Sequence, residues 1–316
     1  PGGKNAWHAA IKQVREIGAS VSSQNQGKDN SSLWGVVAVL EMMTASNMAF
    51  SLCPLLTQGA IDAISHHASE TLQEIYLPKM VSGEWSGTMN LTEPHAGSDV
   101  GALTTKAVPQ EDGTWLVSGT KIFITYGEHE LSENIIHLVL ARTPDAPPGT
   151  KGISLFIVPK FLVNDDGSLG ERNDLRVVSS EHKIGIHASP TCVMSYGDES
   201  GAVGWMVGEE NTGMGAMFTM MNNARLSVGL QGLSLTDRSY QQARQYSLDR
   251  KQGKAIGAQL EAGDSSPIAD HADVRRMLMT MRANAEAMRC VMYANAAAID
   301  FANSSDDETE REYWDA

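Results

Sequence analysis

The chain has 316 residues, which is enough for two or three domains with hydrophobic cores. Its hydrophobic content of 42% and its charged content of 20% are typical of a soluble globular protein. The formal net charge of −14 argues against a nucleic-acid-binding function, because contacts to phosphates need a basic surface. No apolar run reaches the length of a membrane span, so we expect no transmembrane segment.

Cysteine and histidine usage gives no sign of a disulfide framework or a metal site. Cys53, Cys192 and Cys290 are widely spaced and form no Cys-x-x-Cys pair, so we interpret them as reduced structural thiols of a cytoplasmic protein. The adjacent His66 and His67 lack a third ligand at suitable spacing, and we interpret them as the end of a helix. No secretory signal is visible, but the first residue is not Met, so we expect the native N-terminus to lie upstream.

The first part of the chain is predicted to be a helical domain over residues 1–85. Apolar residues at helical spacing predict helices over residues 7–18, 33–50, 55–66 and 70–81. A polar stretch over residues 19–32 predicts a loop. Ser82-Gly83 ends this helical block.

From residue 86 to residue 207 the pattern changes to short β-rich runs between turns, which predicts a barrel or sandwich domain. Asp112-Gly113 indicates a hairpin, and residues 162–174 are predicted to be a solvated excursion. No βαβ unit and no G-x-G-x-x-G motif is present, so a Rossmann fold is disfavoured. The predicted strands cover residues 102–108, 114–117, 121–125, 135–141, 152–159, 176–179 and 191–196.

The last part, residues 208–316, is predicted to be a partial helical bundle. A turn over residues 208–213 leads into a long helix over 214–246, and a second long helix covers 270–303. The acidic end, residues 306–316, has no helix cap, so we expect the natural protein to continue. The predicted fold class is therefore α+β, with an N-terminal helical domain, a central β-barrel and a C-terminal helical bundle that is incomplete in this chain.

The loop over residues 89–99 combines residue types that suit a ligand. Gly97 permits positive φ, and the side chains of Ser98 and Asp99 can bond to nearby backbone. The loop should aim backbone N–H groups and the hydroxyls of Thr92 and Ser98 at one spot. Such a surface suits a neutral heterocycle better than a highly charged ligand. On local chemistry alone, an ordinary turn is an equally good interpretation.

This loop is also the first of several stretches that resemble the acyl-CoA dehydrogenase family, flavoenzymes that oxidise acyl-CoA thioesters. Residues Thr92–Asp99 resemble the signature loop of that family. Residues Tyr76–Glu84 resemble the helix-to-loop run before the signature, and Gly119–Thr125 resemble its flavin-stacking strand. Arg225 and Arg250 match two functional arginines in the expected order.

The resemblance implies that flavin adenine dinucleotide (FAD) is the cofactor. By position, the pyrimidine side of the flavin would be lined by Met89, Leu91, Thr92, Gly97 and Ser98. Phe123, where many relatives have Trp, would pack against the flavin, and Thr125 would form a hydrogen bond near its N5 atom. Without the signature loop, Phe123 reads as a core strand residue and Thr125 as a polar strand position.

The resemblance also implies where the substrate and a second subunit bind. Ser98 would lie near the thioester, while Asn222 and Arg225 would contact the coenzyme-A chain. Many relatives have Asp at the position of Asn222, and the alternative for Arg225 is a solvated or structurally paired arginine. Arg250 and Gln252 would contact the flavin diphosphate of a neighbouring subunit, which implies a homodimer or homotetramer.

The implied reaction is α,β-dehydrogenation of an acyl-CoA to the 2-enoyl-CoA. A carboxylate base removes the α-proton, the β-hydride passes to flavin N5, and the electrons leave to an electron-transfer flavoprotein. Residues 127–134 and 183–191 resemble most a long bacterial subgroup that includes 3-(methylthio)propanoyl-CoA dehydrogenases. The carboxylates considered do not match the family's base, which we therefore expect beyond Ala316; they are Glu261, Glu286, Glu308, Glu310 and Glu312.

Two other functions fit the same residues. The first is an acyl-CoA oxidase or a nitroalkane-oxidase-like relative, in which oxygen consumption needs no added acceptor. The second is a non-catalytic flavin-binding or DNA-protective relative. The charge of −14 argues against DNA binding but leaves a catalytically silent flavoprotein open.

Overall fold

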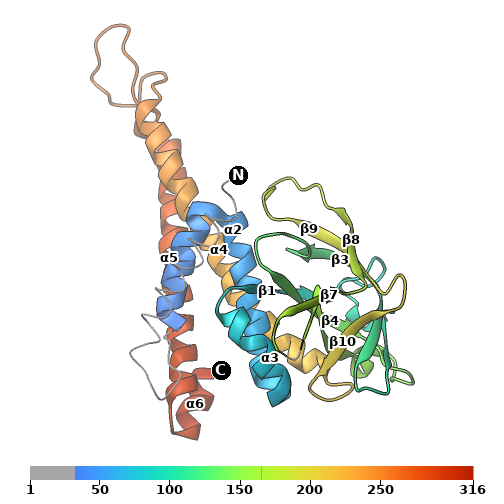
Figure 1. The fold of residues 1–316 in the computed structure, drawn as a ribbon. Coiled ribbons are helices and arrows are strands. Elements are labelled where there is room, and N and C mark those ends of the chain that lie inside the picture. Colours follow the sequence, from blue (N-terminus) through green and yellow to red (C-terminus); the bar gives the residue numbers. More distant parts are fainter. Residues whose placement is uncertain (1–32, 165, 316) are drawn as a thin grey trace. The chain divides into compact units, whose positions relative to one another are not determined.

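The computed structural model describes residues 33–164 and 166–315 of the chain (Figure 1). These residues form two compact units. The first unit comprises residues 49–225, and the second comprises residues 33–48 and 226–315. The helix predicted over residues 7–18 and the loop predicted over 19–32 lie outside the described residues. The domain boundaries predicted near residues 85 and 207 stay a prediction.

The first described helix, α2 (Leu33–His67), replaces the two helices predicted over residues 33–50 and 55–66. Asn47 has φ −155° and ψ 90°, so the two helical segments meet at a kink there. Pro54 lies inside the second segment without ending it. The prediction that His66 and His67 end a helix is confirmed.

Helix α2 is also long and apolar enough to cross a membrane, judged by length and composition alone. Core helices of soluble proteins pass the same test. The side chains of Leu56, Ala60 and Ile64 pack in the hydrophobic core of the first unit, which accounts for the apolar character of this part of α2. The helix is therefore weak support for a membrane span.

Most strands of the first unit belong to one mixed sheet, which follows helix α3 (Glu70–Val81). Among the described residues, the strand order in this eight-stranded sheet is β1-β4-β5-β10-β3-β9-β8, with β2 paired to β3. β1 and β4 run parallel, and the other pairs are antiparallel. The strands are β1 (Trp85–Asn90), β2 (Lys106–Pro109), β3 (Trp115–Thr125), β4 (Asn134–Ala141), β5 (Ser154–Pro159), β8 (Leu175–Ser180), β9 (Thr191–Tyr196) and β10 (Ala202–Val207).

Strand β4 shows why the sheet has two cores. Ile136 and Leu138 point into a cluster that also contains apolar side chains of α2, α3 and helix α4 (Gly213–Asp249). Val139 and Ala141 point to the other face, into a cluster shared with β2, β3, β5, β8, β9 and β10. Because side chains alternate along a strand, packing on both faces buries β4 along its whole length, and apart from Asn134 and His137 its residues are apolar. The α+β class with its order of helices, strands and helices is confirmed.

Several strand predictions need correction. The strands predicted over residues 114–117 and 121–125 are one strand, β3, whose register with β9 shifts between Lys121 and Ile124. The strand predicted over residues 102–108 is replaced by the shorter β2 (Lys106–Pro109), and a 3-10 turn over Val100–Ala102 precedes it. The excursion predicted over residues 162–174 carries a hairpin of β6 (Phe161–Val163) and β7 (Leu169–Arg172). Strands β1 and β10 were not predicted.

The second unit contains the end of α4, helix α5 (Ala272–Ser304) and helix α6 (Glu308–Asp315). The two long helices predicted over residues 214–246 and 270–303 are confirmed, and most of the acidic end forms a further helix, α6. Leu230, Leu233 and Met292 belong to a small core. The bundle is incomplete in this chain, and large apolar side chains stay exposed on its helices: Val228, Met279, Val291, Phe301 and Tyr313.

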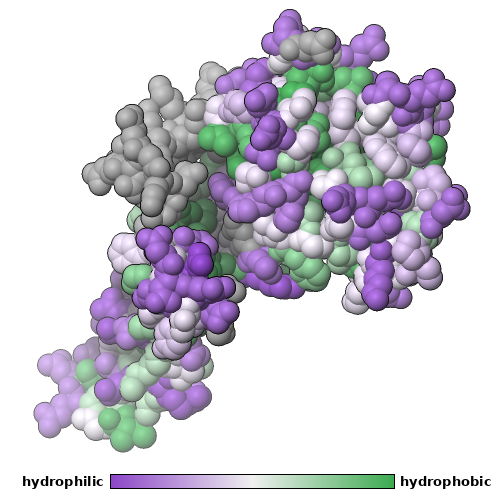
Figure 2. All heavy atoms as spheres, turned by 90° about the horizontal axis from the view of Figure 1, so that it is seen from below, coloured by the Kyte–Doolittle hydropathy of each residue, from purple (hydrophilic) through white to green (hydrophobic). Residues whose placement is uncertain are grey.

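The surface is mixed in character. Figure 2 shows hydrophilic side chains over most of the visible face, with hydrophobic ones between them. Cys53 and Cys192 are free and buried, and Cys290 is free and exposed. Burial raises the pKa of the Cys53 thiol, which makes it an inert core residue.

Candidate functional site

The signature loop begins where β1 ends, in the first unit. Met89 and Leu91 pack against the same core as Met217 and Met220 of α4, so the loop starts from a rigid base. Thr92 is half-buried, whereas Gly97 and Ser98 are exposed. A pair of backbone hydrogen bonds of 3.0 and 3.1 Å between Glu93 and Ala96 closes the turn.

A backbone contact joins this loop to the end of β3. The N–H of Ile122 donates a hydrogen bond of 2.9 Å to the carbonyl oxygen of Thr92. The next residue, Phe123, has a φ of 60° and a side chain that is 57% exposed. A positive φ is strained for a bulky residue and is maintained only where the surroundings impose it. The interpretation of Phe123 as a core strand residue is therefore wrong.

The hydroxyls predicted to meet the ligand are available. Within the part of the chain that the structure describes, the side-chain oxygens of Thr92, Ser98 and Thr125 have no hydrogen-bond partner. Thr125 is half-buried and ends β3, two residues after Phe123. The loop and the strand end together present an aromatic ring and unpaired hydroxyl groups, which is the surface that a planar heterocycle with polar edges requires.

A buried ion pair lies behind the loop and was not predicted from the sequence. The ammonium group of Lys121 lies 2.8 Å from Oε1 of Glu93, and both side chains are buried. Burial alone would raise the pKa of Glu93, but the charge of Lys121 and hydrogen bonds from Lys121, Thr105 and Thr104 hold that pKa well below its usual range. Burial lowers the pKa of Lys121, and Glu93 offsets part of this effect.

A buried polar chain lies next to β1 and was also missed. Nδ1 of His137 lies 2.7 Å from the hydroxyl of Thr88, Asn90 donates to that hydroxyl at 2.9 Å, and Tyr196 donates to Asn90 at 2.9 Å. Burial, with nearby positive charges, lowers the pKa of His137 to about 3. His137 is therefore a neutral core residue at neutral pH. Sequence patterns gave no signal for it because its strand reads as uniformly buried.

The two residues predicted to bind the coenzyme-A chain lie together on α4, in the first unit. Arg225 donates a hydrogen bond of 2.9 Å from Nη1 to Oδ1 of Asn222. Its guanidinium lies 5.6 Å from the ring centre of Phe218. Both polar side chains are exposed, so each can still contact a ligand.

The two residues predicted to reach the flavin diphosphate lie together in the second unit. Nη2 of Arg250 donates a hydrogen bond of 3.1 Å to Oε1 of Gln252. The turn is held by backbone hydrogen bonds, including 3.0 Å from Gln252 to Ser266 and 2.8 Å from Ile268 to Arg250. His271 adds a contact of 2.8 Å to the carbonyl oxygen of Gln252. The two polar side chains are exposed on an ordered turn.

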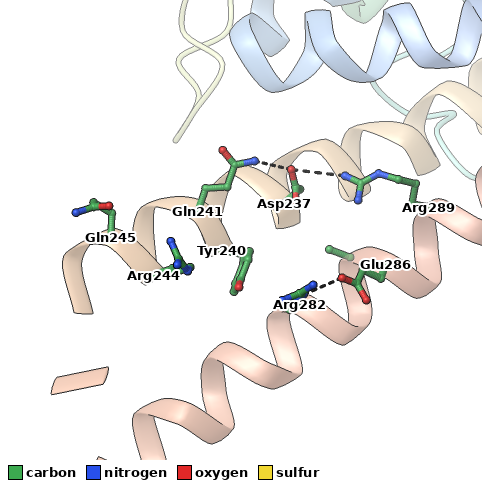
Figure 3. Close-up of a pocket in the computed structure, with 9 residues that line it drawn as sticks. Asp237, Tyr240, Gln241, Arg244, Gln245, Arg282, Glu286 and Arg289 are labelled. Atoms are coloured by element: carbon green, nitrogen blue, oxygen red, sulfur yellow. Dashed lines mark hydrogen bonds and ion pairs between the residues drawn. The ribbon is translucent and has the colours of Figure 1, made fainter. Parts of the chain in front are cut away.

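A polar groove of about 650 Å³ lies between α4 and α5 in the second unit (Figure 3). Its charged groups are mostly paired with one another: Arg282 with Glu286 at 2.8 Å, and Arg289 with Asp237 at 3.5 Å. None of the predicted site residues lines it. Among the described residues, no group of three or more His, Cys, Asp or Glu side chains is placed to hold a metal ion.

Comparisons with known proteins agree with the motifs. Residues 88–198 match the family model "Acyl-CoA dehydrogenase, middle domain", and residues 211–310 match "Acyl-CoA dehydrogenase, C-terminal domain". Among relatives, 3-methylmercaptopropionyl-CoA dehydrogenase of Ruegeria pomeroyi is 52% identical over 87% of this chain and 46% of its own length. Butyryl-CoA dehydrogenase of Syntrophomonas wolfei is 45% identical over 89% of this chain and 47% of its own length.

The chain thus spans about half the length of these two relatives. Among solved structures, a glutaryl-coenzyme A dehydrogenase in complex with glutaryl-CoA matches with a TM-score of 0.72 and 25% identity. That match covers 93% of this chain and 68% of the other. The two family models adjoin in the expected order, and the close relatives carry the family's name. The chain therefore belongs to the acyl-CoA dehydrogenase family.

Proposed function

We propose that the protein is an FAD-dependent acyl-CoA dehydrogenase that oxidises an acyl-CoA thioester to the 2-enoyl-CoA. The observation that carries this proposal is the ring of Phe123, which is exposed at a positive φ beside a loop with unpaired hydroxyl groups. An exposed phenyl ring on a strained backbone is unfavourable in the protein alone, and a stacked flavin would cover it.

The residues present fit the cofactor. The ring of Phe123 offers a stacking face, and Thr92, Ser98 and Thr125 offer hydrogen-bond groups for the polar edge of the flavin. When bound, FAD supplies the acceptor for the substrate hydride. Thr125 would donate a hydrogen bond near N5, and Ser98 would lie near the thioester. We place Met89, Leu91 and Gly97 in the wall beside the pyrimidine ring.

The ends of the two ligands would be held by arginines. Arg225, with Asn222, would bind the coenzyme-A chain through the exposed guanidinium that the hydrogen bond between them orients. Arg250 and Gln252 would contact the flavin diphosphate of a neighbouring subunit, because a guanidinium can donate two parallel hydrogen bonds to a phosphate. This assignment requires a homodimer or homotetramer.

The names of the relatives support a proposal for the substrate. Two relatives at 45% identity or more are named for 3-methylmercaptopropionyl-CoA and butyryl-CoA, so we propose a short acyl group. We further propose that electrons pass to an electron-transfer flavoprotein and that the protein acts in the cytoplasm.

We assign no catalytic base among the described residues, 33–164 and 166–315. Glu286 forms an ion pair of 2.8 Å with Arg282, and Glu261 is exposed in a turn of the second unit. The base must lie near the substrate α-carbon with a pKa tuned by its surroundings. Anaerobic mixing of this chain with FAD and acyl-CoA substrates tests the point. Rapid stoichiometric bleaching of the flavin would show that one of its own carboxylates serves as the base.

The cofactor proposal is tested by reconstitution. We expect the purified protein to take up FAD and to show the visible absorption spectrum of a bound flavin. A protein that stays colourless after incubation with FAD would refute the proposal. Oxygen consumption with acyl-CoA in the absence of another acceptor would favour the oxidase alternative. Binding of FAD without reduction by any acyl-CoA, measured on the full-length protein, would favour a catalytically silent flavoprotein.

A further inference from the structure

The buried ion pair of Glu93 and Lys121 connects three separate segments at the candidate flavin site. Nζ of Lys121 donates to Oε1 of Glu93 at 2.8 Å and to the carbonyl oxygen of Leu91 at 3.1 Å. Oε2 of Glu93 accepts from the N–H and hydroxyl of Thr104 at 2.8 and 3.0 Å. Oε1 also accepts from the N–H and hydroxyl of Thr105 at 3.1 and 2.5 Å.

Stability alone does not account for this buried ion pair. Two charges removed from water lose their hydration, and a well-packed apolar pair of similar size is often as stable. The carboxylate here has both oxygens satisfied by fixed donors, so its position is determined within narrow limits. An ion pair with this many directional contacts specifies one geometry, whereas an apolar pair permits several.

The geometry it specifies is that of the candidate site. Lys121 is the last residue of β3 before the register with β9 shifts, and Phe123, with its positive φ, lies two residues later within the shifted stretch of the strand. Glu93 and Leu91 flank Thr92, whose carbonyl oxygen receives the N–H of Ile122. The ion pair and this backbone hydrogen bond therefore join the loop to the strand at the two residues that precede Phe123.

We propose that Glu93 and Lys121 are positioning residues that hold the stacking face of Phe123 in register with the hydroxyl-bearing loop. The inference rests on the proposed flavin function but concerns residues that would not touch the flavin. Loss of the ammonium group frees the carbonyl oxygen of Leu91 and one side of the carboxylate. The loop and the strand end then move independently, and the two halves of the binding surface no longer match one planar ligand.

The test distinguishes a positioning role of the ion pair from a contribution to the stability of the fold. Lys121→Met alone leaves the buried carboxylate of Glu93 short of a donor, so the decisive variant is the double variant Glu93→Gln, Lys121→Met, which removes both charges of the pair. Lys160→Met is the matched control, because Lys160 forms a partly buried pair with Glu128 elsewhere in the first unit. For each protein we would measure the thermal midpoint, the Kd for FAD by quenching of flavin fluorescence, and the visible spectrum of the bound flavin.

We expect the double variant to be folded, with a thermal midpoint close to that of the wild type, a Kd for FAD at least tenfold higher and an altered flavin spectrum. The control should bind FAD as the wild type does. Wild-type affinity and spectrum in the double variant would overturn the inference.

A second readout needs no cofactor. Amide exchange of Ile122, followed in the cofactor-free proteins, reports the hydrogen bond to Thr92 directly. We expect its protection to fall at least tenfold in the double variant, while the amide of Ala107, which donates to Arg142 at 2.8 Å, keeps its protection. If the wild type binds no FAD, the proposed function fails, and the Ile122 amide still decides the positioning role. Unchanged protection of Ile122 would refute that role.

Discussion

Arg225 donates a hydrogen bond of 2.9 Å to the side-chain oxygen of Asn222, one turn earlier on α4. An exposed pair of this kind stabilises a helix by only about 0.2–0.5 kcal/mol, so its loss should hardly affect folding. The guanidinium nevertheless has a fixed direction, because it also lies over the ring of Phe218. A fixed, exposed cation with little structural value is suited to a ligand.

Replacement of Arg225 by Ala should therefore impair substrate binding and spare the cofactor. We expect the KM for the acyl-CoA to rise roughly tenfold or more, which corresponds to about 1.4 kcal/mol, while FAD remains bound. Steady-state kinetics and the flavin absorbance of the full-length protein measure the two effects. Arg176→Ala is the control, since Arg176 is also an exposed arginine and pairs with Asp198 at 2.6 Å. Equal kinetic effects of both variants would contradict the assignment.

Phe123→Ala should weaken cofactor binding with little change in stability. The side chain is 57% exposed, so its removal opens no cavity in the core, and we expect the free energy of unfolding to change by less than about 1 kcal/mol. The Kd for FAD should rise by roughly tenfold through the loss of stacking. Titration of the cofactor-free protein with FAD measures it. Phe123→Trp keeps a larger ring and should bind FAD as well as the wild type, and a weaker Trp variant would argue against stacking.

Arg250→Ala should reduce FAD retention and oligomer stability together. The guanidinium pairs only with the neutral Gln252 at 3.1 Å among the described residues, so its charge is available to a phosphate. Size-exclusion chromatography with light scattering, before and after removal of FAD, measures both quantities. The control is Arg276→Ala, because Arg276 already pairs with Asp273 at 2.7 Å. Wild-type FAD affinity in the Arg250→Ala variant would show that Arg250 does not bind the cofactor.

Stability should fall in acid because of His137. Its pKa is about 3 in the folded protein and about 6.5 in the unfolded chain, so below pH 6.5 the unfolded chain binds a proton that the folded protein does not. The free energy of unfolding should therefore decrease as the pH falls from 6.5 towards 3. Between pH 7.5 and pH 5 the decrease from this group is roughly 2 kcal/mol.

Urea unfolding at the two pH values measures this effect in the wild type and in His137→Asn. The pKa of His129 is lowered to about 4, mainly by burial, and contributes in the same direction in both proteins. The variant should be less stable at pH 7.5 but should lose less stability at pH 5. An identical loss in both proteins would show that His137 does not carry the effect.

Elements with a clear pattern were predictable from the sequence, and α4, α5 and α3 lie close to their predicted positions. The period of 3.6 residues and the long apolar runs suffice for helices. The break in α2 was misplaced, because Pro54 is tolerated in the helix, whereas Asn47, which no pattern marks, adopts the non-helical geometry. Strand β10 has Gly204 in its middle, which weakens the strand signal in its sequence.

Sequence motifs marked the candidate ligand-facing residues, but they did not mark the buried polar contacts behind them. The loop residues and Phe123 stand in recognisable motifs, and the structure places them on adjoining segments. The pairing of Glu93 with Lys121 joins positions that are 28 residues apart, and such a contact depends on how β3 folds back against the loop. The same holds for the polar chain from His137 to Tyr196, whose members come from three different strands. Sequence periodicity reports which face a residue lies on, but it does not report which partner it meets.

Because Phe123 has a positive φ, the residue that is best for thermal stability at this position differs from the residue that is best for the proposed stacking on the flavin. Glycine adopts this backbone geometry without strain, so Phe123→Gly should stabilise the cofactor-free protein by about 1 kcal/mol. A library randomised at this position and selected only for heat resistance should therefore enrich glycine and asparagine and yield colourless proteins. The same library selected for retention of yellow colour should return aromatic residues. Divergence of the two selected populations at this one position would show that thermal stability and the proposed flavin binding favour different residues there.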